Sequence, residues 1–367
     1  MFFDKSIRYT QRQDYQICNN CVMDTSASEI YFDSEGICGF CAGVNYHIER
    51  TWFPTSAGSN LKREFFQEIR SIGKNKKHDC LIGLSGGVDS AMVLFQAIEN
   101  GLRPLVLHID TGWNTRESVS NVERLTKNFN LDLHTIVIDW DTMRDLQIAY
   151  LESGVLNQDV PQDHALFASI YKFAIANDVT TILSGVNYSS ESVEPASWGY
   201  TYIDGKQIKY IARKFGRNRL RNYPIMRITE YKKLISRNNF EIFRPLDYGV
   251  YNPSESAKVL QKLFGWENYE HKHSESLFTN FFQSIYLYEK YGIDKRRNNY
   301  SSLILSGNMS RNEAIEKLSK SPTDKFGRNR LMQSVCSKLN INEEQMDKYL
   351  NGEKKDHYSY PNDSHKI

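Results

Sequence analysis

The chain has 367 residues, of which 40% are hydrophobic, 25% charged and 13% aromatic, which is enough apolar material for one large or two modest globular units. A mostly disordered chain is therefore excluded. The 46 lysines and arginines nearly balance the 44 aspartates and glutamates, so the net charge of +2 creates no overall field that would attract nucleic acid. No segment approaches the roughly 18 apolar residues of a membrane span, and the first residues lack the apolar core of a signal peptide. We expect a cytoplasmic protein without a membrane partner.

Four of the six cysteines form two CxxC pairs, Cys18 with Cys21 and Cys38 with Cys41. This arrangement is typical of two knuckles that hold one tetrahedral zinc ion. A disulfide framework would need an oxidising compartment, and a thiol-exchange site would need only one pair, so both alternatives are weaker. Four thiolates close the coordination shell, and we therefore predict a structural zinc.

The pattern changes after the polar stretch at residues 55–60. From there apolar runs alternate with amphipathic segments. Strands are predicted at 79–84, 104–109, 134–138 and 180–183, and helices lie between them. This alternation predicts an α/β fold with a doubly wound parallel sheet.

We divide the chain into three parts. A zinc-ribbon-like module covers residues 1–55, the α/β domain covers 56–225, and a mainly helical region over 226–367 supplies the substrate side and the C-terminal part.

The first predicted strand runs into the sequence SGGVDS at residues 85–90, and a helix follows. Such a loop can bring successive backbone N–H groups against an anion, and the start of the helix adds a partial positive charge. The loop lacks the lysine of a Walker A motif and does not fit GxGxxG, so it predicts a phosphate site of another kind. The alternative is a turn that only caps the helix, because serine and aspartate favour helix starts.

SGGVDS resembles the PP-loop of the ATP pyrophosphatase superfamily, whose members adenylate an oxygen of the substrate and let a nucleophile displace AMP. The resemblance implies an adenine nucleotide alpha hydrolase-like fold with ATP and magnesium as cofactors. It places the terminal phosphates at four loop residues, Ser85, Gly86, Gly87 and Ser90, and gives Asp89 the role of placing magnesium.

Two later strand ends match positions that approach the nucleotide in that superfamily. They are His108 with Asp110, and Ser184 with Gly185. For Asp110 alone, capping of the turn that follows is the alternative.

Candidates for the substrate side come from charge and position. Guanidinium forks bind phosphate in a bidentate manner, so two basic segments are substrate-phosphate candidates, although solvated charge would also explain them. Their members are Arg217, Lys295, Arg296 and Arg297. Asp163 and His164 follow the third strand and join Asp89 as catalytic candidates, while His164 equally fits a packed helix start.

The whole chain resembles the N-acetyl sugar amidotransferases of bacterial surface-glycan synthesis, which act in lipopolysaccharide O-antigen and in pseudaminic or legionaminic acid pathways. Besides the CxxC pairs and SGGVDS, four segments carry the resemblance: PQDHALFA at 161–168, PLDYGVYNPSES at 245–256, FGWENYEHKHSESLFTNFFQ at 264–283 and YGIDKRRNNYSSLILSGNMSR at 291–311. The resemblance implies that ATP activates the acetamido oxygen of a sugar or nucleotide sugar and that ammonia then replaces AMP, which leaves an acetamidino group.

The source of ammonia lies outside the chain in this interpretation. Cys80 falls in a strand pattern and Cys336 in a predicted helix, and no glutaminase constellation is evident. The family resemblance implies a separate partner pair, a glutaminase with a cyclase-like protein. The alternative function is a zinc-ribbon PP-loop enzyme that thiolates tRNA. It would need further cysteines near the loop to carry sulfur, and the near-neutral charge disfavours tRNA binding.

Overall fold

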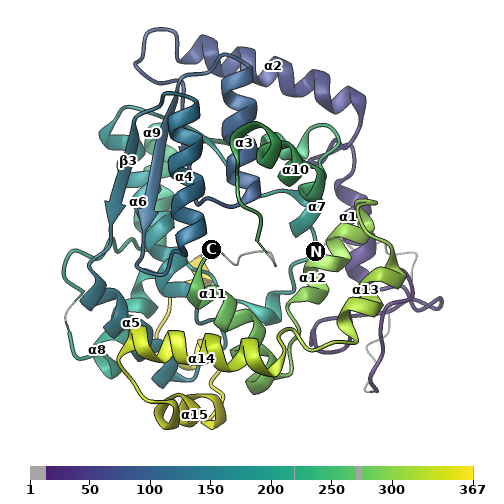
Figure 1. Ribbon diagram of the computed structural model, residues 1–367, viewed down its shortest axis with the longest axis vertical. Coiled ribbons are helices and arrows are strands. Elements are labelled where there is room, and N and C mark those ends of the chain that lie inside the picture. The colour runs from purple at the N-terminus through teal and green to yellow at the C-terminus, as the bar shows by residue number, and fades with distance from the viewer. Residues whose placement is uncertain (1–13, 219, 270–274, 367) are drawn as a thin grey trace.

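The computed structural model describes residues 14–218, 220–269 and 275–366 (Figure 1). Five strands form one sheet in the order β3-β2-β1-β4-β5, and every neighbouring pair is parallel. The strands are β1 Cys80–Gly83, β2 Pro104–Asp110, β3 Leu133–Val137, β4 Thr181–Leu183 and β5 Glu241–Phe243. The predicted parallel α/β fold is confirmed, and β1 to β4 are the four strands that the sequence pattern indicates.

Helices make up most of the remaining structure, and several begin and end at residues that suit those positions. Asp139 caps α5 through the backbone N–H of Thr142, and Gly154 ends it at φ +70°. The capping box of Ser310 and Glu313 opens α13. The helices are α1 Gly39–His47, α2 Ser56–Ile72, α3 Val88–Glu99, α4 Arg116–Asn128, α5 Trp140–Ser153, α6 Val160–Ala176, α7 Tyr188–Glu191, α8 Gly205–Phe215, α9 Ile228–Asn238, α10 Pro253–Phe264, α11 Leu277–Phe281 with the π-helix Phe282–Tyr291, α12 Arg296–Leu305, α13 Arg311–Leu318, α14 Lys325–Leu339 and α15 Glu343–Asn351.

Both faces of the central strands β1, β2 and β4 are buried. Alternate strand residues point to opposite sides, so Leu81 and Leu105 join one apolar cluster while Ile82 and Val106 join another. Residues of α2, α3, α4 and α10 belong to the second cluster, and residues of α5, α6, α8, α11 and α14 belong to the first. This double covering is why the central strands read as continuous apolar runs.

The sheet continues past residue 225, where we predicted the end of the α/β domain. β5 pairs with β4 through Thr181 and Glu241, yet its first two residues are exposed. A strand of three residues with one buried side chain leaves no periodic signal in the sequence, so the prediction missed it.

The cysteine-containing module packs against the body of the protein. Cys18, Cys38 and Trp52 are buried in the same apolar cluster as Leu81 of the sheet. Figure 1 shows α1 beside α12 and α13, so the cysteine-containing module lies next to helices from far along the chain. Among the described residues, none of the helices combines the length and apolar composition needed to cross a bilayer.

Candidate active site and metal centre

The four CxxC cysteines converge on one point. Their sulfur atoms all lie within 4.8 Å of one another, and all four residues are buried. The Sγ atoms are 3.8 Å apart for Cys18 and Cys41, 3.6 Å for Cys21 and Cys38, and 3.7 Å for Cys38 and Cys41. Four sulfurs at about 2.3 Å from a tetrahedral zinc ion would be separated by about 3.8 Å. The cluster therefore fits one zinc ion with four protein ligands, and a backbone N–H of Cys38 also points at Cys18 Sγ at 3.2 Å.

The SGGVDS loop connects the end of β1 to the start of α3. The hydroxyls of Ser85 and Ser90 lie 3.1 Å apart, and the Ser90 hydroxyl donates to the carbonyl of Gly87 at 3.2 Å. The backbone N–H of Gly87 donates to Ser85 Oγ at 3.2 Å. These bonds fold the loop tightly over the N-terminus of α3, which is the arrangement that binds phosphate groups.

The carbonyl of Gly86 is bound by three side chains from other parts of the chain. Trp266 Nε1 donates to it at 3.0 Å, the Tyr269 hydroxyl at 3.1 Å and Asn121 Nδ2 at 3.3 Å. Gly86 has φ +89°, a conformation that glycine adopts without strain. The stretch FGWENY at 264–269, part of a segment quoted above for its family resemblance, therefore has a physical role, since its Trp266 and Tyr269 fix the turn of the PP-loop.

Asp89 is oriented by a tyrosine of the PLDYGVYNPSES segment. The Tyr251 hydroxyl donates to Asp89 Oδ1, and burial together with the Asp89 carboxylate raises the pKa of Tyr251. The hydroxyl thus keeps its proton and fixes the carboxylate. Gly185 lies against the same residue: a Cβ atom at Gly185 would be 3.3 Å from Asp89 Cβ and 3.1 Å from the Ser90 nitrogen. The structure therefore brings together Asp89, Ser90 and Gly185, as the sequence predicts.

The other predicted nucleotide residues brace the strand ends. Buried His108 bonds through Nδ1 to the carbonyl of Leu84 at 2.8 Å and through Nε2 to Asn114 Nδ2 at 3.1 Å. Because the Asn114 amide donates to Nε2, the proton of His108 sits on Nδ1. Asp110 accepts the backbone N–H of Gly112 at 2.8 Å, which is the capping role weighed above. Ser184 similarly accepts from the N–H of Val186 at 3.3 Å.

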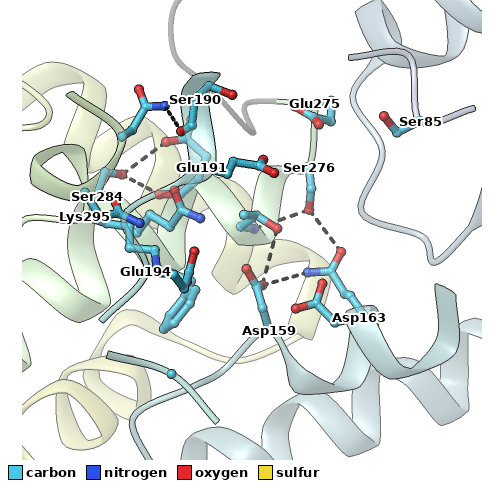
Figure 2. A pocket seen from close by; sticks show the side chains of 18 of the residues that line it. Ser85, Asp159, Asp163, Ser190, Glu191, Glu194, Glu275, Ser276, Ser284 and Lys295 are labelled. Atoms are coloured by element: carbon cyan, nitrogen blue, oxygen red, sulfur yellow. Dashed lines mark hydrogen bonds and ion pairs between the residues drawn. The ribbon is translucent and has the colours of Figure 1, made fainter. Parts of the chain in front are cut away.

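A cavity of about 630 Å³ begins at the carboxyl ends of β1 and β2 and extends to the helical C-terminal region. Gly83, Ser85 and Thr111 line its sheet end, and Lys295 and Tyr300 line its far wall. Figure 2 shows Ser85 and Glu275 on one side of this space and Glu194 and Lys295 on the other. A ligand that spans the cavity would therefore touch both the PP-loop and α12.

The two catalytic candidates after the third strand separate in the structure. Asp163 lines the cavity, whereas His164 has no exposed surface. His164 Nδ1 bonds to the carbonyl of Tyr202, and its Nε2 accepts the backbone N–H of Met226 at 2.9 Å. Burial lowers the pKa of His164 to about 4, so the ring is neutral near pH 7. The structure therefore gives His164 the packed role that we weighed as its alternative.

The basic candidates are dispersed, and three of them, Lys295, Arg296 and Arg297, are paired with acids. Lys295 and Arg296 line the cavity, but Lys295 Nζ lies 3.0 Å from Glu194 and Arg296 Nη2 lies 2.6 Å from Asp294. Arg297 turns away toward the cysteine module. Arg217 lies in a different hollow beside α15, where its backbone N–H donates to Asp145 at 2.9 Å. The structure does not bring Arg217 or Arg297 to the cavity.

Sequence reasoning missed several cavity residues that bear chemistry. Acidic and amide side chains share the wall with Asp163, and they are Asp159, Gln162, Glu191, Glu194 and Glu275. Gln162 Nε2 donates to Asp159 at 3.1 Å, and the Ser276 hydroxyl donates to Gln162 Oε1 at 3.0 Å. A Cβ on Gly87 would lie 3.0 Å from Glu275 Oε1, so this carboxylate stands directly against the PP-loop. Only Gln162 and Glu275 fall within segments that carry the family resemblance, and neither has a spacing that marks its role.

Comparison with models of protein families gives two matches. Residues 79–197 match the queuosine biosynthesis protein QueC, and residues 275–367 match the C-terminal domain of LPS biosynthesis proteins that are WbpG-like. The chain is therefore similar to QueC over its α/β part and to WbpG-like proteins over its C-terminal part. This confirms the family resemblance found in the sequence, and the second match covers the helices that form the far wall of the cavity.

No curated protein matches the chain. Among solved structures, one similar chain is the NH3-dependent NAD synthetase from Campylobacter jejuni in complex with the nitrate ion, with 16% identity, a TM-score of 0.32 and coverage of 73% of this chain and 98% of that one. Another is NMN synthetase from Francisella tularensis, with 17% identity, a TM-score of 0.29 and coverage of 63% and 93%.

Replacing Cys18 or Cys38 by serine should remove the metal and lower the melting temperature, because a closed thiolate site contributes free energy to folding. Metal analysis of the purified variants beside thermal unfolding measures both effects. Cys336→Ser is the matched control, since Cys336 lies outside the cluster and should leave the metal content unchanged. Full metal retention in the Cys18 and Cys38 variants would contradict a four-cysteine site.

Two adjacent glycines should respond differently to substitution. Gly86→Ala places a side chain in a left-handed conformation and against the carbonyl of Ser118, so it should cost at least roughly 1–2 kcal/mol of folding stability. The atoms nearest to a Cβ atom at Gly87 belong to the Ser85 and Glu275 side chains, which can move. Gly87→Val should keep the melting temperature and abolish pyrophosphate release by closing the backbone approach to phosphate. Unchanged pyrophosphate release in Gly87→Val would mean that the loop only caps α3.

His164 should make the fold sensitive to acid. The unfolded imidazole takes up a proton near pH 6.5, whereas the buried ring does so only near pH 4. The contribution of His164 to the free energy of unfolding is therefore fully present above pH 6.5. It decreases as the pH falls toward 4, by roughly 3 kcal/mol at the lower end. Denaturant unfolding of His164→Gln across this range should show a flatter loss than the wild type, with a constant difference above pH 6.5. An equally steep loss in the variant would contradict this account.

Proposed function

We propose that this protein is an ATP-dependent amidotransferase that converts the acetamido group of a bacterial surface-glycan sugar into an acetamidino group. The observation that carries the proposal is the shared cavity of about 630 Å³, which Ser85 of the PP-loop and Tyr300 of the WbpG-like domain both line. An adenylating loop and an acceptor-binding domain must open into one space, because the acceptor oxygen has to reach the α-phosphorus of ATP.

The chemistry explains why such an enzyme would use ATP. An amide oxygen is a poor leaving group, and adenylation with loss of pyrophosphate turns it into one. The ammonia lone pair then forms the new C–N bond, the C–O bond to AMP breaks, and nitrogen gives up a proton. In this chain the PP-loop would hold the phosphates, and the Tyr251 hydroxyl would keep Asp89 oriented toward magnesium.

The acceptor side supports a sugar. Trp198, Phe282 and Tyr300 give the cavity aromatic surface, and its acidic and amide side chains offer hydrogen bonds to hydroxyl groups. Lys295 and Arg296 are already paired with carboxylates, so their charges do not argue for a phosphate group on the acceptor. We therefore propose an acetamido sugar as the acceptor, either free or linked to a nucleotide.

Ammonia would come from a partner. Cys80 is fully buried in β1, and burial raises the pKa of its thiol. Burial also raises the pKa of Cys336 to about 11. A nucleophilic or sulfur-carrying cysteine needs a lowered pKa and access to its substrate. Neither thiol suits glutamine hydrolysis or tRNA thiolation, so we propose a separate glutaminase with a cyclase-like protein as the ammonia source.

The test is incubation of the purified protein with ATP, magnesium, ammonium and candidate acetamido sugars, followed by mass spectrometry. The product should be slightly lighter than the sugar because NH replaces O, and heavy-nitrogen ammonium should raise its mass. Glutamine should not replace ammonium until the partner pair is added. High ammonium at alkaline pH should work best, because neutral ammonia is the nucleophile.

The control for the rival function is the double variant Cys80→Ala with Cys336→Ala. It should retain ammonia-dependent turnover apart from packing losses, since neither sulfur is transferred. A folded double variant that binds ATP but has lost all turnover would favour the sulfur-transfer function over ours.

A further inference from the structure

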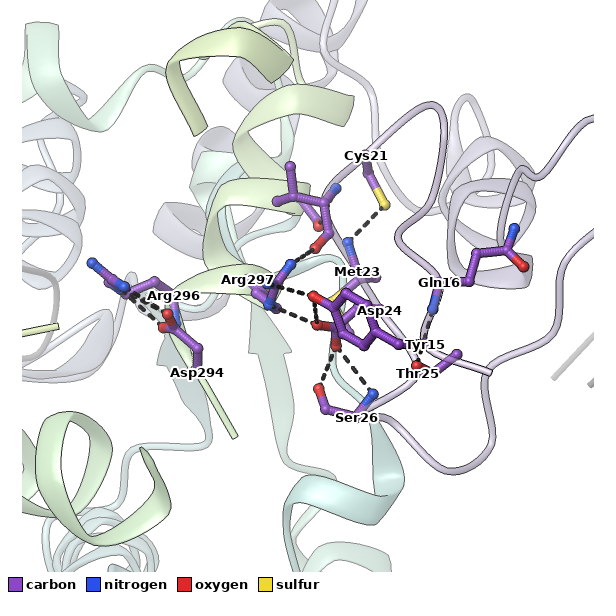
Figure 3. A network of polar contacts seen from close by, with 12 residues as sticks. Tyr15, Gln16, Cys21, Met23, Asp24, Thr25, Ser26, Asp294, Arg296 and Arg297 are labelled. Atoms are coloured by element: carbon purple, nitrogen blue, oxygen red, sulfur yellow. Dashed lines mark hydrogen bonds and ion pairs between the residues drawn. The ribbon is translucent and has the colours of Figure 1, made fainter. Parts of the chain in front are cut away.

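A largely enclosed arginine, Arg297, connects the cysteine module to the WbpG-like domain. Arg297 lies on α12, and its Nε is 2.9 Å from Asp24 Oδ2. Its Nη1 donates to the carbonyl of Val22 at 2.8 Å, and its Nη2 donates to the Tyr15 hydroxyl at 3.1 Å. Both charged side chains are nearly inaccessible, at 14% exposure for Arg297 and 4% for Asp24. Figure 3 shows this guanidinium reaching into the loop that follows the first CxxC pair.

Two further contacts join the same parts of the chain. The backbone N–H of Val22 donates to Ser301 Oγ at 3.2 Å. Arg311, the first residue of α13, donates to the carbonyl of Cys18 at 2.9 Å and to that of Cys21 at 3.0 Å. The first knuckle of the metal site is therefore bound from outside at both of its cysteines.

The opposite side of α12 faces the cavity. Arg297 and Ser301 are four residues apart and lie toward the module. Four of the five helix residues that line the cavity, Arg296, Asn299, Tyr300 and Leu303, follow the spacing i, i+3, i+4 and i+7, and Asn298 is the fifth. Asn299 Nδ2 also donates to the carbonyl of Ser190, another wall residue, at 2.9 Å. Any shift of α12 would thus pass to two parts of the wall.

A helix of ten residues has little stability alone, so its position depends on what it packs against. Removing one member of a buried ion pair leaves an uncompensated charge and disrupts its surroundings. The PP-loop is held by a different set of contacts, from Asn121, Trp266 and Tyr269. The two ends of the cavity therefore have separate supports.

From this arrangement we infer that the four-cysteine site is a positioning element for the acceptor end of the cavity, and that Arg297 is the positioning residue that links the two. With the metal bound and the Arg297–Asp24 pair intact, α12 presents its cavity face in the place that the acceptor requires. Loss of the metal or of the Arg297–Asp24 pair weakens acceptor binding and leaves ATP binding unchanged. The assignment of the far wall to the acceptor rests on the proposed function.

The experiment compares Arg297→Ala, Arg297→Lys and the wild type after metal removal by a chelator. Backbone hydrogen exchange is measured over residues 296–305 and 85–99 of the full chain, with acceptor KM and ATP KM beside it. Arg297→Ala should raise exchange in α12 but not in the PP-loop and α3, and should raise acceptor KM about tenfold with ATP KM unchanged. Arg297→Lys keeps the positive charge but lacks the forked donors of the guanidinium. Its α12 exchange and acceptor KM should lie between those of the wild type and Arg297→Ala. Metal removal should reproduce the exchange pattern.

Arg328→Ala is the matched control, because Arg328 also pairs with a carboxylate, Glu289 at 2.7 Å, but lies outside the cavity lining. It should change neither α12 exchange nor acceptor KM. The inference is overturned if Arg297→Ala leaves α12 exchange at the wild-type level, or if it loosens the PP-loop and α12 equally, as general destabilisation would. A wild type without turnover on any sugar would instead contradict the proposed function, and the exchange data would still decide this inference.

Discussion

The left-handed backbone at Gly86 is the constraint on which the rest of the site depends. With φ +89°, this residue turns the chain from β1 into α3 within a few residues. Its carbonyl is held by Trp266, Tyr269 and Asn121, side chains that come from two distant parts of the chain. A carbonyl fixed on one side of the loop leaves the other side to its N–H groups and to the start of α3. A phosphate site at this point would thus follow from backbone geometry and would need no lysine.

The C-terminal region forms the second wall of the cavity whose first wall is the carboxyl edge of the sheet. Strand ends alone would form a shallow site at the edge of the sheet, as open α/β folds commonly do. Here α12 and the π-helix add a second wall, so the cavity joins the PP-loop to residues more than 200 positions later in the chain, Tyr300 among them. Helices α12 and α13 are in turn bound to the cysteine module through Arg297 and Arg311. This dependence gives the module a place in the architecture of the site beyond the stability of its own segment.

The sequence was most informative where local pattern and local structure coincide. The CxxC spacing, the SGGVDS loop and the apolar runs of β1 and β2 each report a geometry set by neighbouring residues, and the structure contains all of them. β5 was missed because three residues with one buried side chain carry no period. His164 and Arg297 were interpreted from charge and position, but tertiary contacts decide their environment: backbone groups of Tyr202 and Met226 enclose the first, and Asp24 holds the second. The acidic wall around Asp159 and Glu194 is assembled from separate segments, so no linear pattern could reveal it.

We propose that the acetamido oxygen of a sugar is adenylated in the cavity between the PP-loop and α12. The most direct measurement uses an acceptor sugar whose acetamido oxygen is replaced by a heavy oxygen isotope, with ATP, magnesium and ammonium, followed by mass analysis of the AMP formed. If the amide oxygen attacks the α-phosphorus and later leaves with AMP, the heavy oxygen will be found in AMP in proportion to the amidine produced. Amidine formed together with unlabelled AMP would contradict this account.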